Sequence, residues 1–340
     1  MPRDVAAIRR PADSPSIAVG ALTIVTTLVG WSSVPLFITH FADRLDVWTQ
    51  NGWRYALAAL LWAPVPIVAH ARGRLPRGLW RASLLPAVFN GLGQTAFTWS
   101  YYKTDAASAT FGLRAQIVFV AIGAYLLFPA ERALLRRPAA WFGIALVLAG
   151  VSGTIFLAPA ANHSAPTHAL GVLLAVIGGV LFASYGLSVR RNMAGMHPVV
   201  AFAAISQLTA LICIALMLIF GHNLSTARWD GGLSVTSLNP NQFGLLFLSA
   251  VIGIALGHVF YYIAIARIGV AAASAVLQLQ PFLVALGAYL VHSAAVSPAQ
   301  ITAGCIAVAG ALVILAVQWK LSRAARSSSV AQVPTVAAPK

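Results

Sequence analysis

Apolar residues in this chain gather into long runs and do not alternate with polar residues. Short joints of polar residues, Gly or Pro separate ten such runs, which cover residues 17–38, 50–70, 82–102, 106–128, 140–158, 169–189, 198–220, 242–266, 269–291 and 299–319. A helix that crosses a bilayer needs about 20 mostly apolar residues, and each run is close to that length. A membrane barrel would instead show alternation in segments of about ten residues. The pattern therefore predicts an all-α integral membrane protein with ten transmembrane helices.

Composition agrees with this class of protein. Of the 340 residues, 59% are hydrophobic and 9% are charged. A soluble domain has about 25% charged residues, so this chain has too little charge to cover a water-soluble globule. Outside the runs lie a polar N-terminal tail at 1–16, a loop at 221–241, and a Ser/Ala/Pro-rich tail at 321–340 that is predicted to be disordered. None of these segments has room for a soluble catalytic domain.

The net charge of +15 is distributed unevenly among the loops. If the N-terminus is cytoplasmic, most basic residues fall on the cytoplasmic side, in the tails and in the loops around 72–81, 132–137, 190–191 and 267. The opposite side receives Arg44, Lys103 and Arg228 together with the aspartates Asp43, Asp46, Asp105 and Asp230. This positive-inside pattern predicts that both termini are cytoplasmic. A nucleic-acid-binding protein would gather its basic residues on one accessible domain, so the lipid bilayer is the expected partner and nucleic acid is not.

The chain contains an internal repeat. The segment "GAYLLF" at 123–128 returns as "GAYLVH" at 287–292, and the same shift of 164 residues (287 minus 123) places Arg114 on Gln278. Each half, 17–160 and 161–320, then holds five predicted spans. Because five is odd, the two halves must cross the membrane in opposite directions. Secondary transporters with such inverted repeats bind their solute near the midplane between the halves.

The order of several motifs resembles the EamA-type permeases of the drug/metabolite transporter superfamily. The resemblance rests on "LVGWSS" in the first span, "GWRYALAALL" in the second, "LFPAERALLRRPAAWFGIALVLAGV" at 127–151 and "LQLQPFLVALGAYL" at 277–290. The chain departs from the family where Gln116 and Ile117 replace a proline, and where the second half has no acidic residue at 293–295. The resemblance implies a carrier of small organic solutes in the bacterial inner membrane, often an exporter of amino acids or related metabolites.

One charged side chain lies near the middle of a predicted span. Arg114 falls within "TFGLRAQIVFVAIGAYLLF" at 110–128, where a cation costs at least about 2.5–3.5 kcal/mol. Helical spacing places it on one stripe with Thr110 and Tyr125, and the repeat predicts that the matching stripe around Gln278 and Tyr289 faces it. A guanidinium suits a bidentate carboxylate, so Arg114 is a candidate solute anchor. The alternative is a structural role, in which it binds tyrosine hydroxyls or carbonyls left free at a broken helix.

Other polar and aromatic residues inside the spans complete the predicted binding site. The expected substrate-binding residues besides Arg114 are Trp31, Asn90, Gln94, Tyr185, His258, Tyr262 and Gln278. His258 is interpreted either as a group that titrates during transport or as a neutral histidine hydrogen-bonded among tyrosines. Arg54 lies near the end of its span and is expected to reach the membrane surface.

The acidic residues and cysteines limit the chemistry. All seven acidic residues lie in tails, loops or at a span boundary (Glu131), so no mid-span carboxylate is available to relay protons. Cys213 and Cys305 fall inside spans, and we expect no disulfide, metal, cofactor or catalytic group. We therefore expect a secondary transporter that works by alternating access on small polar or amphipathic metabolites, including carboxylate-bearing ones such as amino acids, in the direction of export. Two alternatives remain: a membrane-embedded enzyme that acts on a lipid or isoprenoid phosphate, and a non-transporting membrane scaffold.

Overall fold

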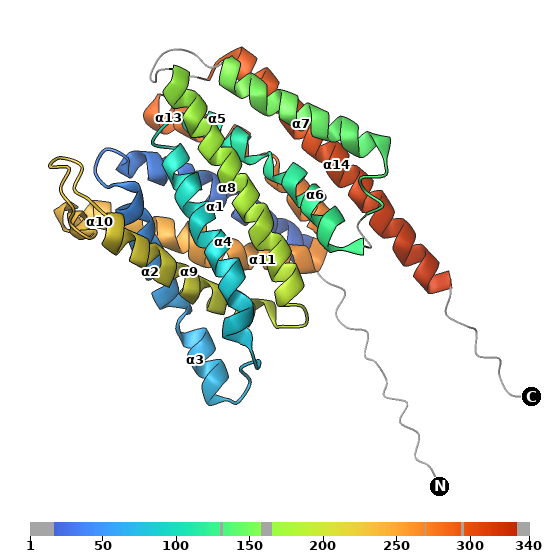
Figure 1. The fold of residues 1–340 in the computed structure, drawn as a ribbon, viewed down its shortest axis with the longest axis horizontal. Coiled ribbons are helices and arrows are strands. Elements are labelled where there is room, and N and C mark those ends of the chain that lie inside the picture. Colours follow the sequence, from blue (N-terminus) through green and yellow to red (C-terminus); the bar gives the residue numbers. More distant parts are fainter. Residues whose placement is uncertain (1–16, 130–131, 158–164, 269, 294–295, 332–340) are drawn as a thin grey trace, which may run out of the picture.

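The computed structural model describes residues 17–129, 132–157, 165–268, 270–293 and 296–331 (Figure 1). Within them the chain forms a bundle of helices. In chain order these are α1 (Ile17–Phe41), α2 (Val47–Trp62), α3 (Pro64–Ala71), α4 (Leu79–Ser100), α5 (Ala106–Leu113), α6 (Gln116–Leu127), α7 (Pro138–Phe156), α8 (Ala165–Asn192), α9 (Pro198–Phe220), η2 (Leu233–Ser237), α10 (Pro240–Ala250), η3 (Val251–Leu256), α11 (Gly257–Ile268), α12 (Val270–Leu277), α13 (Gln280–His292) and α14 (Pro298–Ala331).

Singly or joined end to end, these helices form segments that are long and apolar enough to cross a membrane. Among the described residues, eight helical segments meet that condition, and α7 adds a shorter apolar helix over Pro138–Thr154. The remaining predicted span corresponds to α4, which has 22 residues but carries Arg81, Asn90 and Gln94. The all-α integral membrane fold is therefore confirmed, whereas the number of ten spans stays a prediction.

Two of the predicted spans are broken at positions related by the internal repeat. The fourth predicted span divides into α5 and α6, and the ninth divides into α12 and α13. At the first break, the N–H groups of Arg114 and Ala115 donate to carbonyls three residues back, at 2.9 and 3.1 Å. At the second, those of Gln278 and Leu279 do the same, both at 3.1 Å. Each break is thus a tight 3₁₀-type turn, and the two turns lie 164 residues apart, as the repeat predicts.

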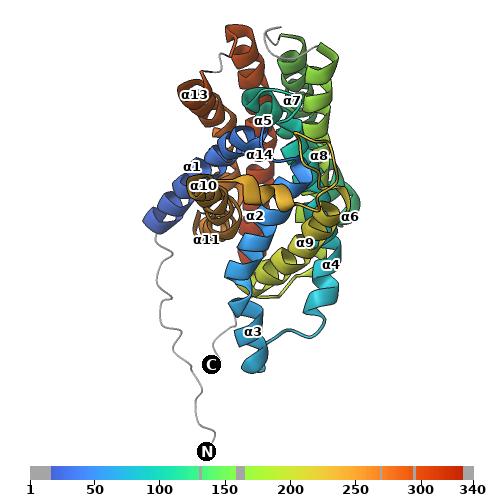
Figure 2. The same ribbon diagram turned by 90° about the vertical axis from the view of Figure 1, so that its left-hand side faces the viewer.

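The two halves of the chain pack against each other throughout the bundle. Helix α1 packs on α11, α2 on α9, α4 on α8, and α7 on α14, so each pair combines one element of the first half with one of the second (Figures 1 and 2). Small residues allow the α7–α14 contact to become very close. A Cβ atom added to Gly150 would overlap the backbone of Ala307. The interface between the halves is consequently the interior of the protein.

Some segments differ from the expectation. Helix α14 continues to Ala331, so the part of the predicted disordered tail from 321 to 331 is helical, and 332–340 lie outside the described residues. The loop at 221–241 contains η2 and a bridge between His222 and Trp229. The predicted tail at 1–16 and Glu131 also lie outside the described residues.

Candidate functional site

Arg114 lies at the break between α5 and α6 and reaches across to the second half of the chain. It is 9% exposed. Its Nη1 donates to the carbonyl oxygen of Leu277 at 3.2 Å, and its Nη2 donates to Oε1 of Gln280 at 3.0 Å. Leu277 is the last residue of α12, where carbonyls lack helical partners and carry partial negative charge. The amide of Gln280 then donates to the carbonyl oxygen of Trp31 at 3.0 Å, which connects Arg114 to α1.

These contacts give hydrogen-bond acceptors to two nitrogens of the Arg114 guanidinium but do not neutralise its charge. The acceptors are a carbonyl and an amide, as the structural alternative for Arg114 expects. Within the described part of the chain, the ion pairs are Arg44 with Asp43 and His168 with Asp105, and neither involves Arg114. In addition, the Nε atom of Arg114 is buried without a hydrogen-bond partner. Arg114 therefore keeps an uncompensated positive charge inside the bundle.

Arg54 is a second buried cation, and its predicted position at the membrane surface is wrong. The residue is 2% exposed, because α10 and η3 pack over this part of α2. Its Nε donates to the hydroxyl of Ser249 on α10 at 3.1 Å, whereas Nη1 is buried with no partner. The sequence did single out Arg54, because this charged residue interrupts an apolar run. Its position near the end of the predicted span, however, favoured a side chain at the membrane surface over a buried one.

The hydroxyl of Tyr55 on α2 interacts with the side chain of Asn90 on α4, and Nδ2 of Asn90 donates to the hydroxyl of Thr209 at 3.2 Å. On α9, the hydroxyl of Ser206 is buried without a hydrogen-bond partner. A buried polar group without a partner costs about 1–3 kcal/mol. The described interior therefore offers both donors and acceptors for a polar ligand.

Aromatic side chains from both halves meet in one group, which we call the aromatic cluster: Trp31, Tyr185, Phe202, His258, Tyr261 and Tyr262. The ring of His258 stacks on Phe202 with centroids 5.0 Å apart and meets Trp31 edge-on at 5.2 Å. The hydroxyls of Tyr185 and Tyr262 lie 3.4 Å apart. The structure thus brings four of the predicted residues together, Trp31, Tyr185, His258 and Tyr262, and adds Phe202 and Tyr261.

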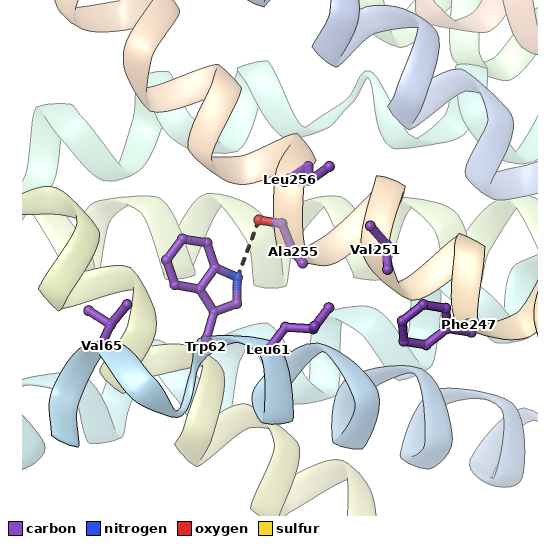
Figure 3. A pocket seen from close by; sticks show the side chains of 7 residues that line it. All are labelled: Leu61, Trp62, Val65, Phe247, Val251, Ala255 and Leu256. Atoms are coloured by element: carbon purple, nitrogen blue, oxygen red, sulfur yellow. Dashed lines mark hydrogen bonds between the residues drawn. The ribbon is translucent and has the colours of Figure 1, made fainter. Parts of the chain in front are cut away.

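A π-helical segment, η3, places polar backbone atoms beside the aromatic cluster. Wider helical turns of this type free carbonyl groups and are frequent at functional sites. The indole of Trp31 donates to the carbonyl oxygen of Gly253 at 3.1 Å, and that of Trp62 donates to Ala255 at 3.2 Å (Figure 3). His258 Nδ1 lies 3.1 Å from the carbonyl oxygen of Ile254; because a carbonyl only accepts, Nδ1 carries the proton and donates.

Other predicted residues lie apart from this arrangement or have local partners. The side chain of Gln278 donates to the carbonyl oxygen of Ser274 at 3.3 Å, and its Oε1 is buried without a partner. Gln94 contributes its backbone carbonyl, which accepts from Asn51 at 3.2 Å. Tyr125 and Tyr289 are 37% and 60% exposed. The predicted facing stripes therefore do not extend to these tyrosines, because each break interrupts the helical spacing.

Two hollows lie elsewhere on the described structure. One, of about 390 Å³, is lined by the apolar residues Leu61, Trp62, Val65, Phe247, Val251, Ala255 and Leu256, between α2–α3 and α10–η3 (Figure 3). The other, of about 440 Å³, is lined by Arg77, Gly78, Arg81, Ala82, Asn192 and Met196. Neither of these two hollows is lined by a predicted site residue.

The helical fold, its two related halves and its polar interior define a multi-pass membrane protein built from two repeats. The sequence pattern of the EamA-like transporter family matches residues 18–156 and again residues 169–316. The chain therefore belongs to the EamA-like transporter family and is a transporter of small molecules. This agrees with the resemblance seen in the sequence.

Comparison with solved structures supports the same fold. A structure described only as "Crystal structure of protein" aligns with a TM-score of 0.56 over 87% of this chain and 96% of that chain, at 20% identity. At this level of identity the likeness concerns the fold alone. No curated protein matches the chain.

Proposed function

We propose that this transporter is a secondary carrier that moves small carboxylate-bearing solutes, such as amino acids, out of the cell by alternating access. The observation that carries the proposal is a pair of buried guanidinium groups, Arg54 and Arg114, with no carboxylate partner among the described residues. All four aspartates that the structure describes lie in loops. A solute carboxylate would supply the missing negative charge.

Burial removes water from both cations. Each buried ion loses several kcal/mol of effective hydration, and a charged partner with good hydrogen-bond geometry offsets that loss. Each of the two guanidiniums also has one buried nitrogen without a partner. An oxyanion that reaches either group would form charge-assisted hydrogen bonds, which are about twice as strong as neutral ones. An anionic or zwitterionic solute is therefore favoured over a cationic one.

The contacts of Arg114 support a role in alternating access. Its two hydrogen bonds join α5–α6 of the first half to α12–α13 of the second. A carboxylate that binds both terminal nitrogens would replace the carbonyl of Leu277 and the amide of Gln280. Binding of solute would thereby loosen a contact between the halves. The aromatic cluster, beside the same crossing through Trp31, would form an apolar wall for the rest of the solute.

We place the protein in the bacterial inner membrane with both termini in the cytoplasm, because the basic residues are concentrated in the loops of one side. Asn90, Gln94 and Gln278 are proposed as additional solute contacts. Of these, Gln278 presents a buried oxygen without a partner, which suits an ammonium or hydroxyl group of the solute.

The test is flux through the purified full-length protein in proteoliposomes. Liposomes are loaded with a panel of radiolabelled amino acids and other carboxylates, and efflux is measured for wild type, Arg114→Lys, Arg114→Gln and the control Arg44→Gln. Arg44 is a loop residue paired with Asp43, so its replacement changes net charge without touching the interior. We expect Arg114→Gln to lower carboxylate flux by about tenfold or more, the value of one charged hydrogen bond of about 1.5–3 kcal/mol. Arg114→Lys keeps the positive charge and should retain part of the carboxylate flux.

Several results would contradict the proposal. Equal flux in wild type and Arg114→Gln would remove Arg114 from solute binding. Wild-type flux of cationic solutes but of no carboxylate in the panel would reject the substrate class. Turnover of a lipid phosphate without any flux would favour the enzyme alternative instead.

A further inference from the structure

The hollow lined by Arg77, Arg81 and Asn192 lies at the end of the bundle where α4 begins and α8 ends. Arg77 and Arg81 are exposed, and no hydrogen bond or ion pair involves their side chains in the described part of the chain. Asn192, half-buried, is the last residue of α8 and adds an amide to the same wall. With a volume of about 440 Å³, the hollow has room for a polar headgroup. Two arginines and an amide form a set of donors that suits a phosphate group.

The surroundings of this hollow carry positive charge. Arg72 and Arg74 lie in the same segment between α3 and α4, and Arg191 precedes Asn192. The lining of the hollow includes no carboxylate, and the aspartates that the structure describes lie in the α1–α2, α4–α5 and α9–α10 loops. An anion at the hollow therefore has no described carboxylate competing for the arginines.

An exposed apolar stripe continues from the hollow along α4. Arg81 is followed at helical spacing by Leu85, Val88 and Leu92, which are all exposed. Trp80, at 42% exposure, lies beside Arg81, and tryptophan is enriched at the level of lipid headgroups. Figure 1 shows α4 and α8 running side by side from this end into the bundle. A ligand with a phosphate in the hollow would thus have an apolar track for acyl chains.

We infer that this hollow is a binding site for the phosphate headgroup of an anionic phospholipid, whose acyl chains lie along the exposed stripe of α4. The shared chemistry, a phosphate between two arginines, would also accept free phosphate. The apolar stripe and Trp80 favour the lipid, because soluble phosphate would make no use of either. The inference goes beyond the proposed solute site and does not depend on it.

The experiment measures lipid binding and leaves transport aside. Purified full-length protein in detergent is titrated with phosphatidylglycerol or phosphatidylcholine, and bound lipid is counted by native mass spectrometry. We expect half-saturation at a concentration about thirtyfold lower for phosphatidylglycerol, since each arginine near an anionic lipid contributes about a fivefold gain. In the double variant Arg77→Gln/Arg81→Gln this preference should fall to within about twofold.

A matched control separates the hollow from the general basic charge of this end. The double variant Arg72→Gln/Arg74→Gln removes the same charge from the same segment but from residues outside the hollow, and it should keep the preference. Equal losses in the two double variants would overturn the site in favour of a diffuse charge effect. Replacement of bound lipid by millimolar inorganic phosphate, with equal stabilisation of the protein, would overturn the lipid and assign the hollow to soluble phosphate. Leu85→Gln should weaken lipid binding and leave phosphate binding unchanged. If lipid binding is unchanged in this variant, the acyl chains do not lie along the exposed stripe of α4.

Discussion

Replacing Arg54 with methionine separates a functional cation from a structural one. Methionine has a similar length and no charge, so it can fill the same space on α2. The change removes one hydrogen bond from a charged donor to Ser249, which is worth about 1.5–3 kcal/mol. Ser249 remains satisfied, because its hydroxyl also donates to the carbonyl oxygen of Leu246 at 2.7 Å.

The same change removes two costs. The buried Nη1 atom without a partner is worth about 1–3 kcal/mol of destabilisation, and the desolvated charge costs several kcal/mol more. The two costs removed are together at least as large as the hydrogen bond that is lost, and replacing a buried ion with a well-packed apolar residue is often neutral or stabilising. We expect Arg54→Met to keep or raise the melting temperature while carboxylate flux falls by about tenfold or more.

The assay pairs two measurements on the same preparation. Thermal unfolding is followed by intrinsic fluorescence in detergent, and efflux is followed in proteoliposomes, with Arg44→Met as a control that removes an exposed arginine. If Arg54→Met lowers the melting temperature and flux in parallel, Arg54 is structural and the reasoning is refuted. If Arg54→Met retains both the melting temperature and the carboxylate flux of wild type, the charge of Arg54 does not take part in solute binding.

Two further predictions concern packing and an unpartnered hydroxyl. Gly150→Leu should strongly reduce the yield of folded protein on size-exclusion chromatography, because a side chain there would overlap the backbone of Ala307. The control Gly186→Leu should be tolerated, because a Cβ atom added at Gly186 meets no atom within 4 Å. Equal yields of the two variants would refute the close α7–α14 contact. Ser206→Ala removes a buried hydroxyl without a partner, so thermal stability should be unchanged or higher, and half-saturation of efflux should shift about tenfold upward if the hydroxyl binds solute. An unchanged half-saturation would exclude Ser206 from the site.

The internal repeat was the most informative part of the sequence for the site. It paired Arg114 with Gln278, and the structure places both residues at equivalent breaks in their helices. The sequence also led to Trp31, Tyr185, His258 and Tyr262, which the aromatic cluster brings together. It did not indicate Gln280 as the partner of Arg114, because the shift of 164 residues (280 minus 116) pairs Gln280 with Gln116. That contact depends on how closely the two broken helices approach, and residue order does not encode this distance directly.

Arg54 and the tyrosines of the two stripes show a second limit. Arg54 lies close to the end of its helix in sequence, yet α10 and η3 cover it. Tyr125 and Tyr289 share a helical period with Arg114 and Gln278 only if each helix is continuous, and the breaks at 114–115 and 278–279 remove that condition. The position of a residue within its helix therefore does not determine how deeply its side chain is buried in the bundle.

By itself the sequence determined the membrane class, the helical fold and the repeat, because long apolar runs have one stable arrangement in a bilayer: helices with every backbone group paired. Only the tertiary structure decided which polar groups lose their contact with water and which find partners. That outcome depends on neighbours from the other half of the chain, such as Ser249 beside Arg54 and Leu277 beside Arg114. The candidate site lies where the two halves bury charge together.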